Sequence, residues 1–199
     1  MGEIHLYGHG DSGHAHKVAL ALRLAKLPHT VTTVDIWAAP ETRPADFLAQ
    51  SPFAEVPLLV IDGQPYVQSG AILLEIATRF GVLGGESHAG LVHARELIVW
   101  EANRIGMCLP QLCAHARGAD GFNDGAIAWL RDRYAVDAAR FDILLGDGPF
   151  FHGAAPGIGD CAIWGYTQWL DVAGVSPSPA MAAWLSRMRA LPEAQGIFA

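Results

Sequence analysis

The sequence predicts an α/β domain over residues 1–81, followed by an all-helical domain over residues 88–199. Short apolar and β-branched runs alternate with helical patterns as far as Phe80, which is typical of α/β folds. Residues 82–87 are rich in glycine and have the composition of a linker. From His88 onward the strand-like alternation is lost and helical patterns remain.

The composition narrows the classes of protein. Hydrophobic residues make up 51% of the 199 residues and charged residues 17%, so the chain can bury a sizeable core. The formal charge of −7 argues against a nucleic-acid partner, which requires a basic face. No apolar run reaches the length of a membrane span, and the first residues lack the pattern of a signal peptide. The three cysteines show no CxxC spacing, so we expect a cytoplasmic protein without a membrane partner.

The first 50 residues predict two strands and two helices. A strand over residues 4–7 leads through a turn over residues 9–13 into a helix whose apolar residues begin at Val18 and which ends near Leu27. A β-branched, alternating strand follows over residues 30–36, and then a short helix over residues 45–49. Because a helix joins the two strands, we expect them to pair in parallel.

Residues 51–80 predict a hairpin and a helix. The apolar run in this stretch is too short for a helix, and an Asp-Gly pair follows it whose residues both tolerate positive φ. The predicted elements, in order, are a strand (58–61), a two-residue turn (Asp62-Gly63), a return strand (Tyr66-Val67) and a helix capped by Ser69 that ends at Phe80.

This arrangement could hold the backbone of a peptide. A cis bond between Val56 and Pro57 would turn the Val56 amide and carbonyl toward solvent. A helix that starts at Ser69 offers unpaired amides and a positive dipole end, which attract a carboxylate, and Gln68 adds a side-chain amide. The alternative is an ordinary hairpin followed by a capped helix, without a ligand.

The second half of the chain predicts four helical segments. In order they are residues 88–115, which Pro110 should kink or break, a segment from an Asp124 cap to about Leu145, the strongly apolar residues 158–172, and residues 180–191. Asp160 is expected to accept backbone amides at the start of the third segment, where Gly157 replaces a hydroxyl cap.

The order and spacing of these features resemble a known family. A loop ending in Val-Pro, a short hairpin, and Gln-Ser before an Ala-Ile-Leu helix resemble the thioredoxin-like half of the glutathione transferases, and the helical second half agrees. The resemblance implies glutathione as co-substrate and a homodimer. It also implies that Val56, beside Pro57, pairs with the cysteinyl backbone of glutathione, and that Gln68 and Ser69 hold the γ-glutamyl end.

Two hydroxyl groups are candidates for stabilising the glutathione thiolate. Ser12 lies in SGHAHKV, which resembles the Ser-Gly-Asn-x-x-Lys-Val pattern of bacterial, theta- and nu-like members whose serine contacts the thiol. Tyr7 occupies the position used by the tyrosine-type classes and is the second choice. Capping of the following helix is the structural alternative for Ser12. His14 stands where the pattern has Asn, and either donates a second hydrogen bond to the sulfur or is an exposed residue of the first turn.

Three residues near the expected site bear on glutathione binding and assembly. Arg43 lies where related sequences often place a Lys that pairs with the glycine carboxylate, although a solvated loop arginine is the alternative. Glu55 departs from the Lys, Arg or Gln of many relatives, and its charge would weaken binding of a carboxylate ligand. Phe53 lies where some dimeric classes place an aromatic residue that enters the partner subunit, with local packing as the alternative.

The resemblance implies a transferase, in which the glutathione thiolate attacks an apolar electrophile in detoxification. The second substrate is expected against Arg104, Met107, Cys108 and Gln111. The enzyme alternative is glutathione-dependent reduction of peroxides or disulfides. The other alternative is a binding or regulatory protein that keeps the fold, and Glu55 is the feature that favours it.

Histidines and cysteines give little support for a metal site. The four histidines at positions 5, 9, 14 and 16 straddle a turn and a helix, and no carboxylate or cysteine completes a regular set of ligands. Cys108 and Cys113 are expected to be buried thiols. We therefore expect no metal.

Overall fold

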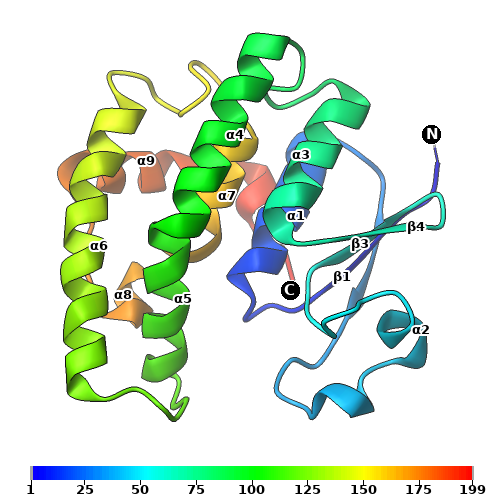
Figure 1. Cartoon of the computed structure of the whole chain (residues 1–199). Coiled ribbons are helices and arrows are strands. Elements are labelled where there is room, and N and C mark those ends of the chain that lie inside the picture. The colour runs from blue at the N-terminus through cyan, green and yellow to red at the C-terminus, as the bar shows by residue number, and fades with distance from the viewer. Residues whose placement is uncertain (1, 199) are drawn as a thin grey trace.

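A computed structural model describes residues 2–198 (Figure 1). The N-terminal part contains β1 (Ile4–Gly8), α1 (Gly13–Leu24), β2 (Thr30–Thr33), η1 (Pro40–Thr42), α2 (Ala45–Leu48), β3 (Leu58–Ile61), β4 (Gln64–Val67) and α3 (Ser69–Phe80). The helical part contains α4 (His88–Asn103), α5 (Ile105–Ala116), α6 (Asp124–Leu145), α7 (Ile158–Thr167), α8 (Leu170–Ala173), α9 (Pro179–Ala190) and η2 (Pro192–Ala194). A sheet with helices followed by a helical region confirms the predicted fold class.

The four strands form one mixed sheet in the order β2-β1-β3-β4. β1 and β2 pair in parallel, as predicted, and β3 is antiparallel to both of its neighbours. The β3–β4 hairpin turns at Asp62 and Gly63, whose φ angles are 53° and 78°. Positive φ at both positions matches the two-residue turn expected from the Asp-Gly pair.

The core lies between the sheet and the helical part. α1 and α3 pack against each other, and both contact α7 (Figure 1). One hydrophobic cluster therefore continues from the sheet into the helices. A smaller cluster of Tyr7, Val34, Phe47 and Leu58 brings together residues of β1, β3 and α2. α1 is buried along most of its length, including Gly13 and Ala15 in its first turn.

Two helix starts differ from the sequence prediction by one residue. Gln68, and not Ser69, is the N-cap of α3, because Gln68 adopts a left-handed φ of 68° and the helix already begins at Ser69. Asn123, and not Asp124, caps α6, and its side chain accepts a hydrogen bond from the Ala126 amide at 2.8 Å. In both cases the conformation of the preceding residue decides where the helix begins.

The long predicted helix over residues 88–115 is broken at Arg104 and not at Pro110. Arg104 has φ −123° and ψ −93°, which ends α4 and starts α5. Pro110 lies inside α5, and the carbonyl that its missing amide leaves free belongs to Gly106, the second residue of that helix. The predicted second strand is also shorter, ending at Thr33, and the apolar residues 158–172 divide into α7 and α8.

Asp160 anchors the start of α7, as the sequence predicts. Its buried carboxylate accepts hydrogen bonds from the Gly157 amide (2.9 Å), the Phe151 amide (3.1 Å) and the indole of Trp184 (2.9 Å). A Cβ on Gly157 would lie 2.4 Å from the ring of His152. The imidazole therefore occupies the space of the expected hydroxyl cap.

All three cysteines are free and buried thiols. The helices between residues 2 and 198 are all too short or too polar to cross a lipid bilayer.

Candidate functional site

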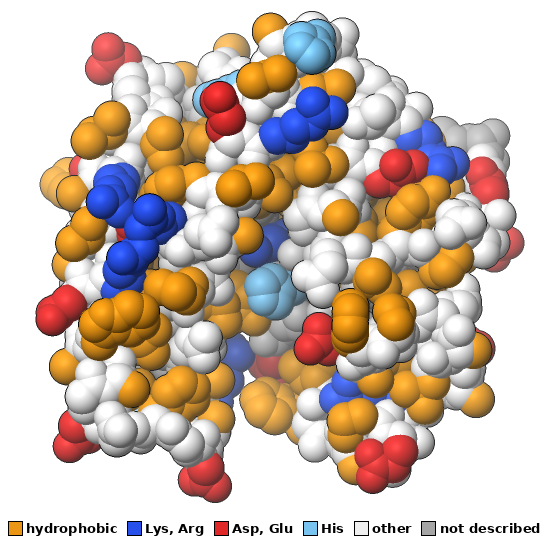
Figure 2. Space-filling model, viewed as in Figure 1, with side chains coloured by type: hydrophobic (Ala, Val, Ile, Leu, Met, Phe, Trp, Pro, Cys, Tyr) orange, Lys and Arg blue, Asp and Glu red, His pale blue; other side chains and the backbone are white. Residues whose placement is uncertain are grey.

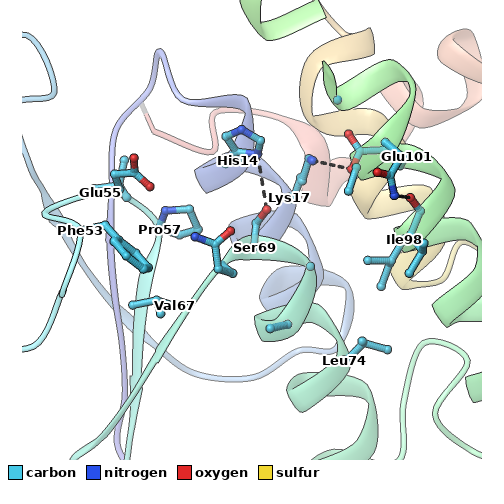
Figure 3. A pocket seen from close by; sticks show the side chains of 18 of the residues that line it. His14, Lys17, Phe53, Glu55, Pro57, Val67, Ser69, Leu74, Ile98 and Glu101 are labelled. Atoms are coloured by element: carbon cyan, nitrogen blue, oxygen red, sulfur yellow. Dashed lines mark hydrogen bonds and ion pairs between the residues drawn. The ribbon is translucent and has the colours of Figure 1, made fainter. Parts of the chain in front are cut away.

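A cavity of about 490 Å³ lies between the N-terminal part and the junction of α4 with α5. Figure 2 shows the molecule hollowed at this place, with a histidine and a basic side chain in the hollow. The wall is built from the loop before β3, the start of α3, one face of α1 and the end of α4 (Figure 3). Its polar groups include His14, Lys17, Gln68, Ser69 and Glu101.

The loop before β3 presents a free peptide unit to this cavity. The bond between Val56 and Pro57 is cis, and the Val56 amide and carbonyl make no hydrogen bond within residues 2–198. The Ser51 hydroxyl fixes the loop, because it donates to the Glu55 carbonyl (3.1 Å) and accepts from the Glu55 amide (3.2 Å). The loop thus offers one donor and one acceptor at a defined place.

The start of α3 forms the next part of the wall. Gln68 is exposed and has a φ of 68°, a conformation that costs energy in residues other than glycine. Ser69, Gly70 and Ala71 line the cavity with the first turn of the helix, where backbone amides lack intrahelical partners. An exposed, strained polar residue beside a positive helix end suits a carboxylate ligand.

Ser12 and Tyr7 differ in what their hydroxyl groups do. Ser12 is buried and caps α1, accepting from the Ala15 amide at 3.2 Å, but its own hydrogen has no acceptor within residues 2–198. The Tyr7 hydroxyl donates to the Asp46 carboxylate at 2.7 Å. Burial and that carboxylate raise the pKa of Tyr7 to about 12. The tyrosine proton is therefore already engaged, whereas the serine proton is available. Both residues are buried, and neither is among those that line the cavity.

His14 faces the cavity from the first turn of α1 (Figure 3). Its Nδ1 lies 3.4 Å from the Ser69 hydroxyl, and its ring packs edge-on against Tyr166. Burial, with a smaller effect of the Lys17 charge, lowers the pKa of His14 to about 3. The imidazole is therefore neutral near pH 7 and keeps one N–H to donate.

Lys17 and Glu101 form a buried ion pair in the cavity wall, with Nζ 2.8 Å from Oε2 (Figure 3). The sequence analysis assigned neither residue a role. The sequence does contain a signal that Lys17 is buried, because it lies among alanine, valine and leucine residues in an apolar helix. A lysine in such surroundings requires a partner.

Other expected site residues lie outside the cavity wall. The guanidinium of Arg43 donates to the backbone carbonyls of Ala54 and Ile36, the latter at 3.1 Å, and so holds its own loop. The four residues expected to contact the second substrate lie on α5 or at its start: Cys108 is fully buried, Met107 half-buried, Gln111 exposed, and Arg104 faces a separate groove.

On the side of the helical part, the apolar wall of the cavity comes instead from the end of α4 and the first turn of α5. It is formed by Ile98, Val99, Ala102 and Gly106. Phe53 and Glu55, which the sequence analysis connected with assembly and ligand affinity, also line the cavity, and Phe53 is 62% exposed.

The N-terminal histidines have separate partners. His5 contacts the Thr32 hydroxyl, His9 accepts from the Asp11 amide, and His16 contacts the Gly10 carbonyl. Among the residues that the structure describes, no three histidine, cysteine or acidic side chains are placed to hold a metal ion.

Comparisons with known proteins agree with this architecture. Residues 11–79 match the family description "Glutathione S-transferase, N-terminal domain", and residues 124–187 match "Glutathione S-transferase, C-terminal domain". The disulfide-bond oxidoreductase YfcG of Escherichia coli is 28% identical over 196 residues, which covers 89% of this chain and 86% of that protein.

Solved structures give the same result. A glutathione S-transferase from Xanthobacter autotrophicus superimposes with a TM-score of 0.81 at 26% identity, covering 96% of this chain and 95% of the other. A theta-class glutathione S-transferase from Xanthomonas axonopodis, solved with glutathione bound, superimposes with a TM-score of 0.85 at 19% identity, covering 100% and 99%. At 19% identity, the superposition on the theta-class structure shows that the two proteins share a fold.

Proposed function

Because the chain belongs to the glutathione S-transferase family, we propose that it binds glutathione in this cavity and transfers it to an apolar electrophile. One observation carries the proposal. The free Val56 peptide unit, the strained Gln68 and the first turn of α3 all line the same cavity. These groups match the backbone and the carboxylate of a γ-glutamyl tripeptide.

Each part of the wall has a proposed role in holding glutathione. The Val56 amide and carbonyl pair with the cysteinyl unit, with Pro57 fixing their direction. Gln68, the Ser69 hydroxyl and the amides of α3 hold the γ-glutamyl end. The resemblance implies that Arg43 pairs with the glycine carboxylate, but its guanidinium binds backbone carbonyls, so we assign it the role of shaping this loop instead. The theta-class relative with bound glutathione supports this ligand.

The chemistry requires that a thiol be ionised. A free cysteine thiol has a pKa of ~8.5. Lowering that pKa by ~2 units stabilises the thiolate by roughly 2.7 kcal/mol. Ser12 does not line the cavity itself, but His14, two residues later, does. The Ser12 hydrogen has no acceptor within residues 2–198, so we assign its hydroxyl as the donor to the sulfur of bound glutathione. Neutral His14 supplies a second donor in the cavity, and the positive end of α1 acts in the same direction.

Reduction of disulfides by glutathione is the second candidate function, and the similarity to the E. coli disulfide-bond oxidoreductase favours it. The same site would then direct a glutathione thiolate onto a disulfide sulfur. A binding role without catalysis is the third candidate. Glu55 supports it, because an exposed carboxylate in the wall disfavours an anionic tripeptide.

The proposal extends to assembly and setting. We place the protein in the cytoplasm as a homodimer that acts on small hydrophobic electrophiles in detoxification. The exposed Phe53 ring supports the dimer, and the three free cysteines are consistent with a reducing compartment. Sedimentation of the native protein and of Phe53→Ser tests the dimer, which we expect the substitution to weaken.

Calorimetric titration with glutathione, on the native protein and on Ser12→Ala in parallel, tests the proposed function. We expect both to bind glutathione, and the pKa of the bound thiol to be higher in the variant. Binding in both with an unchanged thiol pKa would move the thiolate-stabilising role to Tyr7 or His14. Absence of binding to the native protein would reject the enzyme and favour a partner-binding role.

A further inference from the structure

The loop that carries Ser12 is held by the helical part of the chain. This loop joins β1 to α1, and the Ser12 amide donates to the His9 carbonyl at 3.0 Å. On its far side, Gly13 packs so closely against α7 that an added Cβ would lie 2.6 Å from the Gly165 carbonyl oxygen. The position of the Ser12 hydroxyl therefore depends on residues far away in the sequence.

Arg117, the residue after α5, makes the polar contact of the helical part with this loop. Its Nη1 donates to the Asp11 carbonyl oxygen at 3.2 Å, and its Nη2 lies 3.9 Å from the Asp11 carboxylate. The guanidinium packs over the ring of Trp169, with a distance of 4.8 Å from Cζ to the ring centroid. The indole of Trp37 also donates to the Asp11 carboxylate, at 3.1 Å, so residues of both the N-terminal and the helical part hold the aspartate.

The carbonyl that accepts from Arg117 belongs to the peptide unit that contains the Ser12 amide. A hydrogen bond to that oxygen fixes the plane of the unit, and with it the backbone from which the Ser12 side chain projects. The stacking on Trp169 fixes the guanidinium itself, since a planar cation over an aromatic face has few orientations. The contact is thus a rigid connection from the end of α5 to the residue before Ser12.

We propose that Arg117 is a positioning residue, which acts through the Asp11 carbonyl to hold the Ser12 hydroxyl in the direction that meets the glutathione sulfur. The inference rests on the proposed function, because it assumes that Ser12 stabilises the thiolate. It assigns Arg117 no contact with glutathione. A direct effect of its charge on the thiolate is the competing explanation, and the two make different predictions when Ser12 is absent.

The test is a double-mutant cycle on the pKa of bound glutathione, followed by the ultraviolet absorbance of the thiolate as pH is varied. The proteins are the native chain, Arg117→Met, Ser12→Ala and the double variant. Arg117→Met should raise the pKa of the bound thiol by about 1, and in the Ser12→Ala background it should have no further effect. Glutathione affinity should change less than about threefold, because Arg117 does not line the cavity.

Two variants serve as controls. Arg131→Met removes an exposed arginine of α6 that makes no ion pair or hydrogen bond within residues 2–198, and it should leave the thiol pKa unchanged. Arg117→Gln keeps a planar amide over Trp169 but loses reach and charge, and it should raise the thiol pKa as Arg117→Met does. It keeps the inference testable if the methionine variant does not fold.

The outcomes separate the inference from the proposed function. If Ser12→Ala raises the thiol pKa and both Arg117 variants leave it unchanged, the inference is wrong and the proposed function stands. If Arg117→Met has an equal effect with and without Ser12, its charge acts directly and the positioning role is rejected. If Ser12→Ala itself has no effect, the role proposed for Ser12 fails and the inference fails with it.

Discussion

Lys17 of α1 and Glu101 of α4 form an ion pair across the junction between the N-terminal and helical parts, with side chains only 3% and 4% exposed. The second carboxylate oxygen of Glu101 has no hydrogen-bond partner among the described residues. A buried pair of this kind contributes little net stability by itself, because desolvation of both charges offsets their attraction. The pair matters for stability because removing either charge would leave the other one buried without a counter-charge.

The first prediction concerns this pair. Glu101→Gln should lower the free energy of unfolding by about 3–5 kcal/mol, because it leaves the Lys17 ammonium buried without a counter-charge. The double variant Lys17→Met/Glu101→Leu should recover most of that loss. Urea unfolding at pH 7 measures both. Glu75→Gln is the matched control, since it breaks a partly exposed pair with Arg79 and should cost less than about 1 kcal/mol. If Glu101→Gln and Glu75→Gln lowered the free energy of unfolding by the same amount, that would contradict the argument.

The second prediction concerns Tyr7. Tyr7→Phe should leave the pKa of bound glutathione unchanged, because the phenol proton is donated to Asp46 and its own pKa is raised to about 12. Stability should fall by about 1 kcal/mol with the lost hydrogen bond. Thiolate absorbance in the variant is the measurement. An increase in the thiol pKa similar to that expected for Ser12→Ala would assign the activating hydroxyl to Tyr7.

The third prediction concerns the strained conformation of Gln68. Gln68→Gly should leave the protein equally stable or up to about 1 kcal/mol more stable, because glycine adopts a φ of 68° without a steric penalty. Glutathione affinity should nevertheless fall about tenfold with the loss of the side-chain amide, which corresponds to about 1.4 kcal/mol. Gln68→Ala separates the two effects, since it loses the amide but keeps the strain.

The hairpin region could be predicted because its signals are local. Asp62 and Gly63 specify a turn by their own tolerance of positive φ, and Gly81 ends α3 in the left-handed conformation, with a φ of 62°. The N-caps of α3 and α6 were each misplaced by one residue, and in α3 the reason is that Gln68 takes a conformation that its side chain does not favour. That conformation reflects the geometry of the site and not the propensity of the residue.

The unpredicted features depend on contacts between distant parts of the chain. Lys17 and Glu101 are 84 residues apart, and Arg117 and Asp11 are 106 apart. The break at Arg104 has no proline or glycine at that residue, whereas Pro110 gave a local signal that the structure accommodates inside a helix. Side-chain charge predicts that a partner is needed, but it does not identify that partner.

The fourth prediction concerns the missing hydroxyl cap of α7. Serine is normally a better N-cap than glycine, so Gly157→Ser would be expected to stabilise an isolated helix. In this protein it should destabilise by about 1–3 kcal/mol, because the new Cβ would lie 2.4 Å from the His152 ring. Repeating the substitution in a His152→Ala background should reduce the cost. A gain in stability from Gly157→Ser in the native background would show that the ring moves aside easily.

The last prediction concerns the pH dependence of stability. The His152 Nε2 accepts a hydrogen bond from the Gly159 amide at 3.2 Å, which requires a neutral ring. Burial, reinforced by neighbouring His93 and opposed by Glu86, lowers the pKa of His152 to about 4. In the unfolded chain the pKa is near ~6.5, so the unfolded state binds the extra proton first as the pH falls.

His152 therefore contributes its full stability above pH ~6.5, and this contribution is lost as the pH falls from there toward 4. We expect a loss of about 2 kcal/mol over that window, less than the full shift implies because the ring keeps some contact with water. Urea unfolding of the native protein and of His152→Gln at several pH values measures the difference, and His115→Gln, at an exposed histidine of α5, is the control. His14 has its pKa lowered in the same way, so some acid sensitivity should remain in His152→Gln. A pH profile identical to that of the native protein would mean that the ring of His152 is protonated at no cost to the fold.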